Sequence, residues 1–241
     1  MGFYKSIARV YNQIFPLNPG QVNFTTGVFV YPGDSSILDI GCGTGSLSLA
    51  LASTFKRVVG IDLDEKMIEE ARSAAPETLN LEFIPLNMLA IDPHFHAGSF
   101  DGILCYGNTL VHLSSLEQIS LFFKKCKRLL APKGKLLIQI INYDRILDQK
   151  IGSLPTIESD ELQFVRNYIY HPEEHLIDFE TILTLKAQGQ VIRNSVPLFP
   201  VRKSELEDLL KDAGFSYLNF FGNFKREILS SESIPLVIEA G

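Results

Sequence analysis

The sequence predicts an α/β fold in which a parallel sheet is interrupted by a small antiparallel β insertion before its last elements. Three observations lead to this prediction: strand and helix patterns alternate from residue 35 to residue 141, three strand patterns without an intervening helix occupy 161–199, and one helix pattern and two strand patterns follow. The chain has 241 residues, of which 46% are hydrophobic and 21% charged. It is therefore long enough for one large domain with an insertion, and its composition excludes disorder.

The N-terminal stretch is expected to form a helical flap over residues 1–34. Apolar and aromatic residues recur at helical spacing between residues 3 and 15, and Pro16 and Pro19 interrupt the pattern. One or two short helices should result. Tyr4 and Tyr11 lie in this flap, where each ring can either close over a bound cation or pack against its neighbours.

The α/β core is expected over residues 35–147. Strand patterns lie at 37–40, 58–61, 81–84, 102–106 and 135–141, and helical patterns lie at 47–51, 67–74 and 116–130. Strands that alternate with helices are joined by crossovers and therefore run parallel. Asp64 is placed to cap the helix that contains Met67.

The antiparallel insertion is expected over residues 148–200, with strands at 164–170, 176–185 and 190–198. Turn signals at His171-Pro172 and Gln188-Gly189 separate these strands, so neighbouring strands should form hairpins. Residues 201–241 are expected to complete the core. They contain a helix at 204–213, closed by Gly214, and strands at 217–221 and 235–239.

Composition argues against several classes of partner. The chain has 28 acidic and 22 basic residues, a net charge of −6, which is the wrong sign for neutralising nucleic-acid phosphates. No apolar run approaches the roughly 18 residues of a membrane span, and Lys5 and Arg9 stand where a signal peptide would be apolar, so we expect a cytoplasmic protein. Its three cysteines form no CxxC pair, and the His94–His96 pair has no third ligand, so neither a disulfide nor a metal site is expected.

A glycine-rich turn follows the first strand and opens the first helix, reading ILDIGCGTGS over residues 37–46. Glycines allow the backbone to approach a ligand closely, and the unpaired N–H groups of a helix start favour an anionic group. A dinucleotide fingerprint, GxGxxG, would need glycine at position 46, where this chain has Ser46. The turn therefore favours a nucleoside-type ligand over a pyrophosphate.

Asp62 ends the second strand about 20 residues further on, where a carboxylate can accept both hydroxyls of a ribose. Asn87, at the end of the third strand, can bind a purine edge, with Leu63 and Met88 on the two faces of the ring. An ordinary loop asparagine and a core methionine explain the same pattern. Asp39 can either order the glycine turn or reach a ligand ammonium through water.

The glycine turn, together with VGID at 59–62 and the acidic helix start at Asp64 and Glu65, resembles the class I S-adenosylmethionine-dependent methyltransferases. The resemblance covers about 35–141 and the tail from Ser204 to Phe215. It implies a Rossmann-like, doubly wound, seven-stranded sheet whose last strand is antiparallel, with S-adenosyl-L-methionine across the strand ends. Many members carry Asp where Asn87 stands. The expected cofactor-binding residues are Asp39, Gly41, Cys42, Gly43, Asp62, Leu63, Met67, Asn87, Met88 and Tyr106.

Two shorter segments, YGNTLVHL at 106–113 and INYDRIL at 141–147, resemble the glycine and sarcosine N-methyltransferases. This resemblance implies that Gly107, Asn108 and His112 line a substrate amine site and that the antiparallel insertion covers the substrate. Asn108 and His112 are the expected catalytic residues. The expected substrate-binding residues are Gly107, Asn108, His112, Asn142, Tyr143 and Arg166.

Methyl transfer to an amine is an in-line displacement that requires alignment and a neutral lone pair. The Gly107 carbonyl and the Asn108 side-chain oxygen can accept the amine N–H bonds. His112 can accept a proton or can tie the loop to the next helix, and both readings stay open. A substrate carboxylate would need a cation such as Arg145, Arg166 or Arg202.

The sequence thus predicts an S-adenosylmethionine-dependent methyltransferase that acts on a small molecule, with N-methylation of an amine or amino acid as the preferred reaction. The acceptor atom remains open between N, O and C, and the oligomeric state remains open between monomer and homodimer. The alternatives are a dinucleotide-dependent oxidoreductase and a non-catalytic cofactor-binding module. No nucleic-acid or membrane partner is expected.

Overall fold

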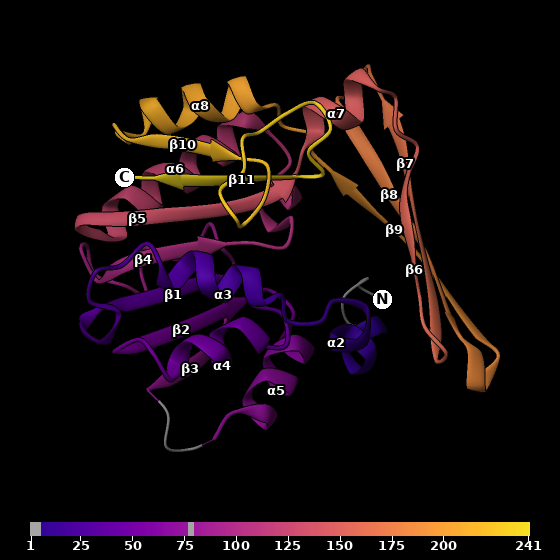
Figure 1. The fold of residues 1–241 in the computed structure, drawn as a ribbon, viewed down its shortest axis with the longest axis horizontal. Coiled ribbons are helices and arrows are strands. Elements are labelled where there is room, and N and C mark those ends of the chain that lie inside the picture. The colour runs from indigo at the N-terminus through magenta and orange to yellow at the C-terminus, as the bar shows by residue number, and fades with distance from the viewer. Residues whose placement is uncertain (1–5, 77–79) are drawn as a thin grey trace.

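Two separate β-sheets organise the molecule, and the computed structural model describes residues 6–76 and 80–241 of it. The larger sheet has seven strands in the order β10-β11-β5-β4-β1-β2-β3, and the smaller has four in the order β6-β7-β8-β9. Figure 1 shows the smaller sheet standing beside the edge of the α/β core from which α7 emerges. Within the described residues, no helix is both long and apolar enough to cross a bilayer.

The seven-stranded sheet is mixed, with one antiparallel strand. Its strands are β1 (Ser36–Ile40), β2 (Arg57–Asp62), β3 (Leu81–Pro85), β4 (Phe100–Cys105), β5 (Leu130–Ile141), β10 (Leu218–Phe221) and β11 (Pro235–Ala240). The strands from β1 to β5 pair in parallel, whereas β11 runs antiparallel to both of its neighbours, β5 and β10. The predicted sheet, mostly parallel with its last strand antiparallel, is confirmed.

Helices cover both faces of this sheet because successive residues of its central strand face opposite ways. Ile37 belongs to the apolar cluster that contains Phe24 of α3 (Pro19–Thr26) and Leu51 of α4 (Ser46–Ala52). Leu38 belongs to the cluster on the other face, which includes residues of α6 (Leu116–Leu129) and α8 (Lys203–Asp212). Both clusters are buried, which makes the sheet doubly wound. Helix α5 (Glu65–Ala74) packs beside β3 and begins at the predicted cap, Asp64.

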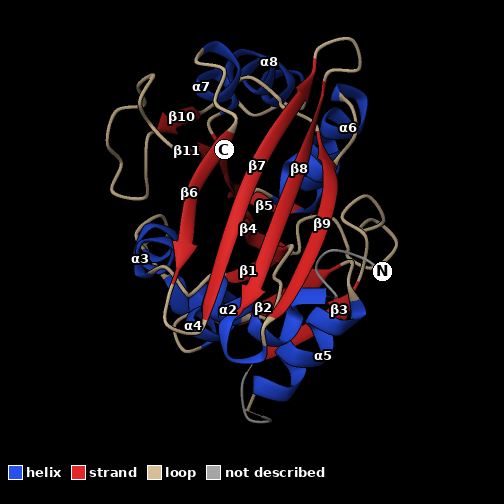
Figure 2. Ribbon diagram, turned by 90° about the vertical axis from the view of Figure 1, so that its right-hand side faces the viewer, coloured by secondary structure: helices blue, strands red, loops and turns tan. Residues whose placement is uncertain are grey.

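The N-terminal segment contacts the small sheet as well as the core. After a 3₁₀ turn at Ala8–Val10 comes α2 (Tyr11–Ile14), and both precede α3. Ile7 and Ile14 share a buried cluster with Leu162 and Phe164 of the small sheet. Figure 2 shows α2 near one end of the small sheet's strands. Residue 4, placed by the sequence in the same flap, lies outside the described residues.

The antiparallel sheet has four strands, one more than predicted: β6 (Ser153–Glu158), β7 (Leu162–His171), β8 (Leu176–Leu185) and β9 (Gln190–Leu198). The missed strand, β6, lies at the sheet edge and contains Pro155, which hides it from a propensity argument. A short helix, α7 (Tyr143–Asp148), was also not predicted. The remaining 3₁₀ turns lie at Pro32–Asp34, Thr109–His112 and Lys186–Gln188.

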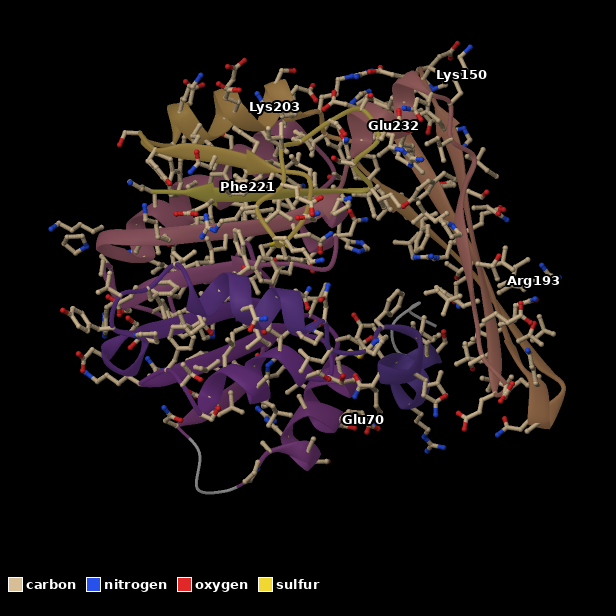
Figure 3. The ribbon with its side chains drawn as sticks, in the orientation of Figure 1. Glu70, Lys150, Arg193, Lys203, Phe221 and Glu232 are labelled. Carbon is tan, nitrogen blue, oxygen red and sulfur yellow. The ribbon has the colours of Figure 1, made fainter. Side chains whose placement is uncertain are left out.

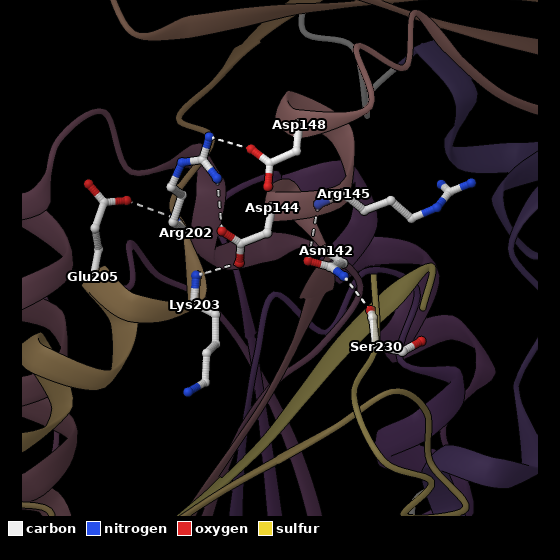
Figure 4. A network of polar contacts seen from close by, with 8 residues as sticks. All are labelled: Asn142, Asp144, Arg145, Asp148, Arg202, Lys203, Glu205 and Ser230. Carbon is white, nitrogen blue, oxygen red and sulfur yellow. Dashed lines mark hydrogen bonds and ion pairs between the residues drawn. The ribbon is translucent and has the colours of Figure 1, made fainter. Parts of the chain in front are cut away.

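Asn142 starts α7 and holds the C-terminal loop in place (Figure 4). Its side-chain oxygen accepts from Arg145 N (3.5 Å), and its amide nitrogen donates to the carbonyl oxygens of Ser230 (3.3 Å) and Ser233 (3.1 Å). Asn142 is only 3% exposed, so its own amide is shielded from water, whereas Ser230 is exposed and Ser233 partly buried. Asn142, expected to bind substrate, therefore has a structural role, because its amide is occupied by the backbone.

Ion pairs between Arg202 and two carboxylates connect the start of α8 to α7. Arg202 donates to the carboxylates of Asp144 (3.0 Å) and Asp148 (2.9 Å), and the Lys203 backbone N–H donates to Asp144 (2.9 Å). Arg202, one of the cations considered for a substrate carboxylate, is thus already paired within the protein. Ion pairs this exposed contribute little individually, but the network sets the position where the chain re-enters the core.

We predict that Asn142→Ala lowers the free energy of unfolding by about 1–3 kcal/mol, because it removes a helix cap and the two hydrogen bonds that this buried amide donates to the C-terminal loop. Gln149→Ala is the matched control: its amide also reaches the C-terminal loop, at Ser231 O (3.0 Å), but is exposed. It should cost no more than about 0.5 kcal/mol. Chemical denaturation of both variants measures the difference, and equal stabilities would contradict the structural role of Asn142.

Candidate functional site

The glycine turn after β1 is tied to the end of β2. The backbone N–H groups of Gly41 (2.8 Å) and Cys42 (3.0 Å) both donate to the Ile61 carbonyl. Gly43 adopts φ +56°, and a Cβ at this residue would lie 3.1 Å from the Tyr11 ring. The turn therefore requires glycine both for its conformation and for the close approach of Tyr11.

Asp62 joins this turn to the helix that follows β2. One carboxylate oxygen accepts from Gly43 N (2.9 Å) and the other from Asp64 N (2.9 Å). Burial raises the pKa of Asp62, while these two hydrogen bonds oppose the shift. A carboxylate has about four acceptor positions, so each oxygen of Asp62 retains capacity for a ligand hydroxyl.

The residues expected around an adenine differ in their exposure. Leu63, which follows Asp62, is 73% exposed, although a leucine side chain is more often buried. Asn87 is exposed and accepts from Leu89 N (2.8 Å), and Met88 is partly buried against the main core. Met67 is 1% exposed within α5, so its side chain belongs to the packed interior. An apolar ring bound at this edge would cover Leu63.

Asp39 is a buried carboxylate at the base of the turn. It is 3% exposed and accepts from Ser48 Oγ (2.6 Å). Burial, opposed by that hydrogen bond and aided by the charge of Asp62, raises the pKa of Asp39 to about 6. A cation brought close to Asp39 would favour its charged form.

A cavity of about 410 Å³ lies between the glycine turn, the N-terminal segment and the inner face of the small sheet. Eight of the residues predicted to form the site line it: Asp39, Gly41, Cys42, Tyr106, Gly107, Asn108, His112 and Arg166. Gly43, Asp62, Leu63, Met67, Asn87, Met88, Asn142 and Tyr143 do not. The structure thus gathers the residues expected at the reacting end of the ligand and leaves the expected ribose and adenine contacts outside this cavity.

The backbone after β4 turns sharply into the cavity at Gly107 and Asn108, which both adopt φ +69°. Gln139 of β5 fixes this turn: its side chain accepts from Gly107 N (2.9 Å) and its carbonyl from Asn108 N (3.1 Å). Two consecutive residues in the left-handed region are uncommon, and asparagine tolerates that region better than most other residues. The turn is therefore preorganised before any ligand binds.

The Asn108 side chain is held on both sides. Its oxygen accepts from Ile141 N (2.9 Å), and its amide nitrogen donates to the Tyr143 hydroxyl (3.0 Å). Tyr143 is 1% exposed, so it acts on the cavity through Asn108 and is a positioning residue. The Tyr143 hydroxyl also lies 3.5 Å from the Asn108 oxygen, a longer contact that a ligand N–H can replace.

His112 lines the cavity at the end of the 3₁₀ turn that follows Asn108. Burial lowers the pKa of its imidazole to about 4, which keeps the ring neutral at physiological pH. A neutral imidazole has one nitrogen that accepts a hydrogen bond. The ring at the cavity wall is therefore uncharged.

Tyr106 and Cys42 line the cavity without ionising. The Tyr106 hydroxyl shares a hydrogen bond with Thr25 Oγ1 of α3 (3.0 Å), and burial raises the pKa of both Tyr106 and Cys42. The other two cysteines, Cys105 and Cys126, are fully buried and free. Across residues 6–76 and 80–241 there is no cluster of three or more His, Cys, Asp or Glu side chains that could hold a metal ion.

Sequence reasoning missed two polar residues of the cavity. Asn12 of α2 accepts from the hydroxyls of Thr44 (2.6 Å) and Ser46 (3.0 Å), which fastens the N-terminal segment to the glycine turn. Gln139 is the one polar side chain in the run LLIQII at 136–141. A polar residue in an otherwise apolar strand could have indicated that its side chain faces a site. Tyr168 and Phe179, which line the cavity from the small sheet, follow from strand alternation only once the register is known.

The site fits S-adenosylmethionine by its chemistry. The glycine turn lets a ligand approach the backbone, Asp62 retains acceptor capacity for ribose hydroxyls, and Leu63 offers an exposed apolar surface. Asp39 supplies a carboxylate at the cavity wall, where the cofactor's cationic end would lie.

Comparison with known proteins agrees with this chemistry. A family model described as a methyltransferase domain matches residues 37–134. The putative methyltransferase YqeM of Bacillus subtilis is 24% identical over 98% of this chain and 96% of its own length. A ubiquinone biosynthesis O-methyltransferase of Coxiella burnetii is 29% identical over 85% and 84%, and a glycine/sarcosine N-methyltransferase of Halorhodospira halochloris is 28% identical over 80% and 70%.

Solved structures show the same fold. The CcbJ methyltransferase of Streptomyces caelestis superposes with a TM-score of 0.82 at 20% identity, covering 97% of this chain and 95% of that one. The methyltransferase domain model and the curated relatives favour methyl transfer over dinucleotide-dependent oxidation. Residues 37–134 match the methyltransferase domain family, and the chain is an S-adenosylmethionine-dependent methyltransferase.

Proposed function

We propose that this enzyme transfers the methyl group to the nitrogen of a small amine or amino acid. The observation that carries the proposal is the pairing of two uncharged acceptors, at Gly107 and Asn108, with a buried imidazole whose pKa is about 4. The name of the Halorhodospira relative supports the same acceptor class, whereas that of the Coxiella relative points to oxygen.

Nitrogen and oxygen acceptors make different demands on the protein. A neutral amine already carries its reactive lone pair and needs only orientation, while a hydroxyl needs a base matched to its pKa. Burial makes His112 too weak a base for that second task. The cavity is therefore better suited to an amine.

Each residue of the site then has a defined task. When bound, the cofactor supplies an activated methyl group on sulfur. The Gly107 carbonyl and the Asn108 oxygen accept the N–H groups of the amine, and Tyr143 and Gln139 keep these acceptors in position. Alignment of this kind is worth up to about 7–11 kcal/mol of the reaction barrier. A neutral primary amine has only two N–H groups, so His112 is an alternative acceptor for one of them, directly or through water, and the methylated product leaves as an ammonium ion.

We propose that the cofactor is bound mainly by the turn at Gly41–Gly43 and by Asp62, with Leu63, Asn87 and Met88 around the adenine and Asp39 facing the cationic end. Cys42 and Tyr106 form the wall between cofactor and acceptor, since both line the cavity. Met67 supports the packing beneath this edge.

Asp62→Asn is predicted to weaken the binding of S-adenosylhomocysteine at least tenfold, because the amide cannot accept from both ribose and Gly43. Isothermal titration calorimetry measures the dissociation constant. Glu65→Gln is the control, since Glu65 is an exposed carboxylate in the first turn of α5 and should leave the affinity within twofold. Equal affinities of wild type and Asp62→Asn would remove the ribose assignment.

Cofactor affinity should also depend on pH through Asp39. Its pKa of about 6 falls when a cation lies nearby, so binding releases a proton, and affinity rises with pH up to about 6 and levels off above it. Titrations between pH 5 and 8, after correction for the cofactor's own ionisation, measure this slope. Asp39→Asn should flatten it, and a wild-type profile that is already flat would contradict the assignment.

His112→Ala is predicted to lower kcat at least tenfold while leaving the dissociation constant of S-adenosylhomocysteine within twofold. The reason is that His112 contacts the acceptor side of the cavity. Steady-state assays with the best amine from a panel measure kcat, and His94→Ala, which alters an exposed histidine away from the cavity, is the control. Unchanged kcat would assign His112 a purely structural role.

A further inference from the structure

The middle of the inner face of the small sheet is apolar except for one row. Its apolar members include Phe164 and Tyr168 on β7 and Phe179 and Leu183 on β8, all buried or packed in the core clusters. Between them, the register aligns Arg166 of β7 with Thr181 of β8 and Asn194 of β9. Residues in register point to the same face, so three polar side chains cross an otherwise apolar surface.

Two atoms of this row are buried and have no hydrogen-bond partner. The Asn194 amide donates to Ser6 Oγ (3.1 Å), so that residue is accounted for. Arg166 donates through Nη2 to the Pro155 carbonyl, but its Nε is buried and unpaired. Thr181 is 2% exposed, and its hydroxyl oxygen is also unpaired. Buried polar atoms are nearly always satisfied, so an unsatisfied pair in adjacent residues points to a missing ligand.

The charge of Arg166 is equally uncompensated. Among the described residues it forms no ion pair, and the only carboxylate that lines the cavity is Asp39, which is bound to Ser48. Burial lowers the pKa of Arg166, which reflects the cost of removing a cation from water. Keeping a guanidinium at a cavity wall without a counter-ion costs stability, and a bound anion would offset that cost.

The row lies close to the amine site. Arg166 lines the same cavity as Gly107 and Asn108, whereas its neighbour Thr181 is buried and is not among the lining residues. Tyr168 lies two residues after Arg166 on the same face of β7, roughly 7 Å from it along the strand. The centre of the Tyr168 ring lies 6.5 Å from that of Tyr143, whose hydroxyl binds the Asn108 amide. An acceptor bound by its amine at Asn108 therefore extends toward Arg166.

We propose that Arg166 and Thr181 form a subsite for a carboxylate of the methyl acceptor, so that the substrates of this enzyme are amino acids and not simple amines. The Arg166 guanidinium donates to the carboxylate from the cavity wall, Thr181 lies in register beside it as a second donor beneath the lining, and the Tyr168 and Phe179 rings exclude water. This inference rests on the proposed N-methylation, which supplies the amine end of the same substrate.

The test compares acids with their uncharged analogues. Glycine, alanine and phenylalanine and their primary amides are titrated into the complex with S-adenosylhomocysteine, and transfer of a radiolabelled methyl group to each is measured in parallel. We expect the wild-type protein to bind the best acid at least tenfold more tightly than its amide. Arg166→Met should abolish this preference, and Thr181→Val should reduce it several-fold.

Two controls separate the subsite from other effects. Arg193→Met removes an exposed arginine on the outer face of the same sheet, which points away from the core in Figure 3, and should leave the preference intact. The dissociation constant of S-adenosylhomocysteine should stay within twofold in Arg166→Met. The melting temperature of ligand-free Arg166→Met should be no lower than that of wild type, because the unpaired cation is gone.

The outcomes distinguish this inference from the proposed function. If acids bind through Arg166 but no methyl group is transferred, the carboxylate subsite stands and N-methylation fails. If amides are methylated as well as acids, and Arg166→Met changes neither, N-methylation stands and the subsite is wrong. The subsite is also overturned if no acid binds to the wild-type complex, or if Arg166→Met weakens the cofactor instead.

Discussion

The site depends on the attachment of the glycine turn to the end of β2. The Ile61 carbonyl receives two N–H groups of the turn, and the Asp62 carboxylate receives a third while also holding the start of α5. These bonds place two neighbouring strand ends and one helix start in a fixed relation before a ligand arrives. A cofactor bound there meets a surface already formed, which lowers the entropic cost of binding. The parallel order of β1 and β2 makes this possible, because both strands end at the same edge.

The acceptor side is built differently, from segments far apart in the sequence. Gly107 and Asn108 come from the end of β4, Gln139 from β5, and Arg166 from the small sheet. The N-terminal segment joins the small sheet to the core through a shared apolar cluster and through Asn12. In the proposed function, the core provides the cofactor side and the amine acceptors at Gly107 and Asn108, and the inserted sheet adds Arg166 as the group that selects the acceptor. Differences between this enzyme and its relatives in substrate should lie mainly in that sheet.

Much of the fold was predictable because the relevant signals are local. The alternation of strands and helices, the cap at Asp64 and the glycine turn all lie within short stretches of sequence. The predictions failed where residues far away in the sequence determine the contacts of a side chain or the pairing of a strand. Asn142 resembles a ligand after a strand, but carbonyls about ninety residues later, at Ser230 and Ser233, engage its amide. Pro155 concealed β6, and the row of Arg166 and Thr181 became visible only with the register of β7 and β8. The sequence placed Arg166 near a substrate but did not indicate its neighbour.

The central claim is that the turn after β1 and the carboxylate at the end of β2 together hold an adenosyl group. A crystal structure of the complex with S-adenosylhomocysteine tests this most directly. We expect ribose hydroxyls within hydrogen-bond distance of Asp62, the adenine against Leu63, and the sulfur facing the cavity that Asn108 lines. Density for the ligand at another edge of the sheet, or a ribose with no contact to Asp62, would contradict it.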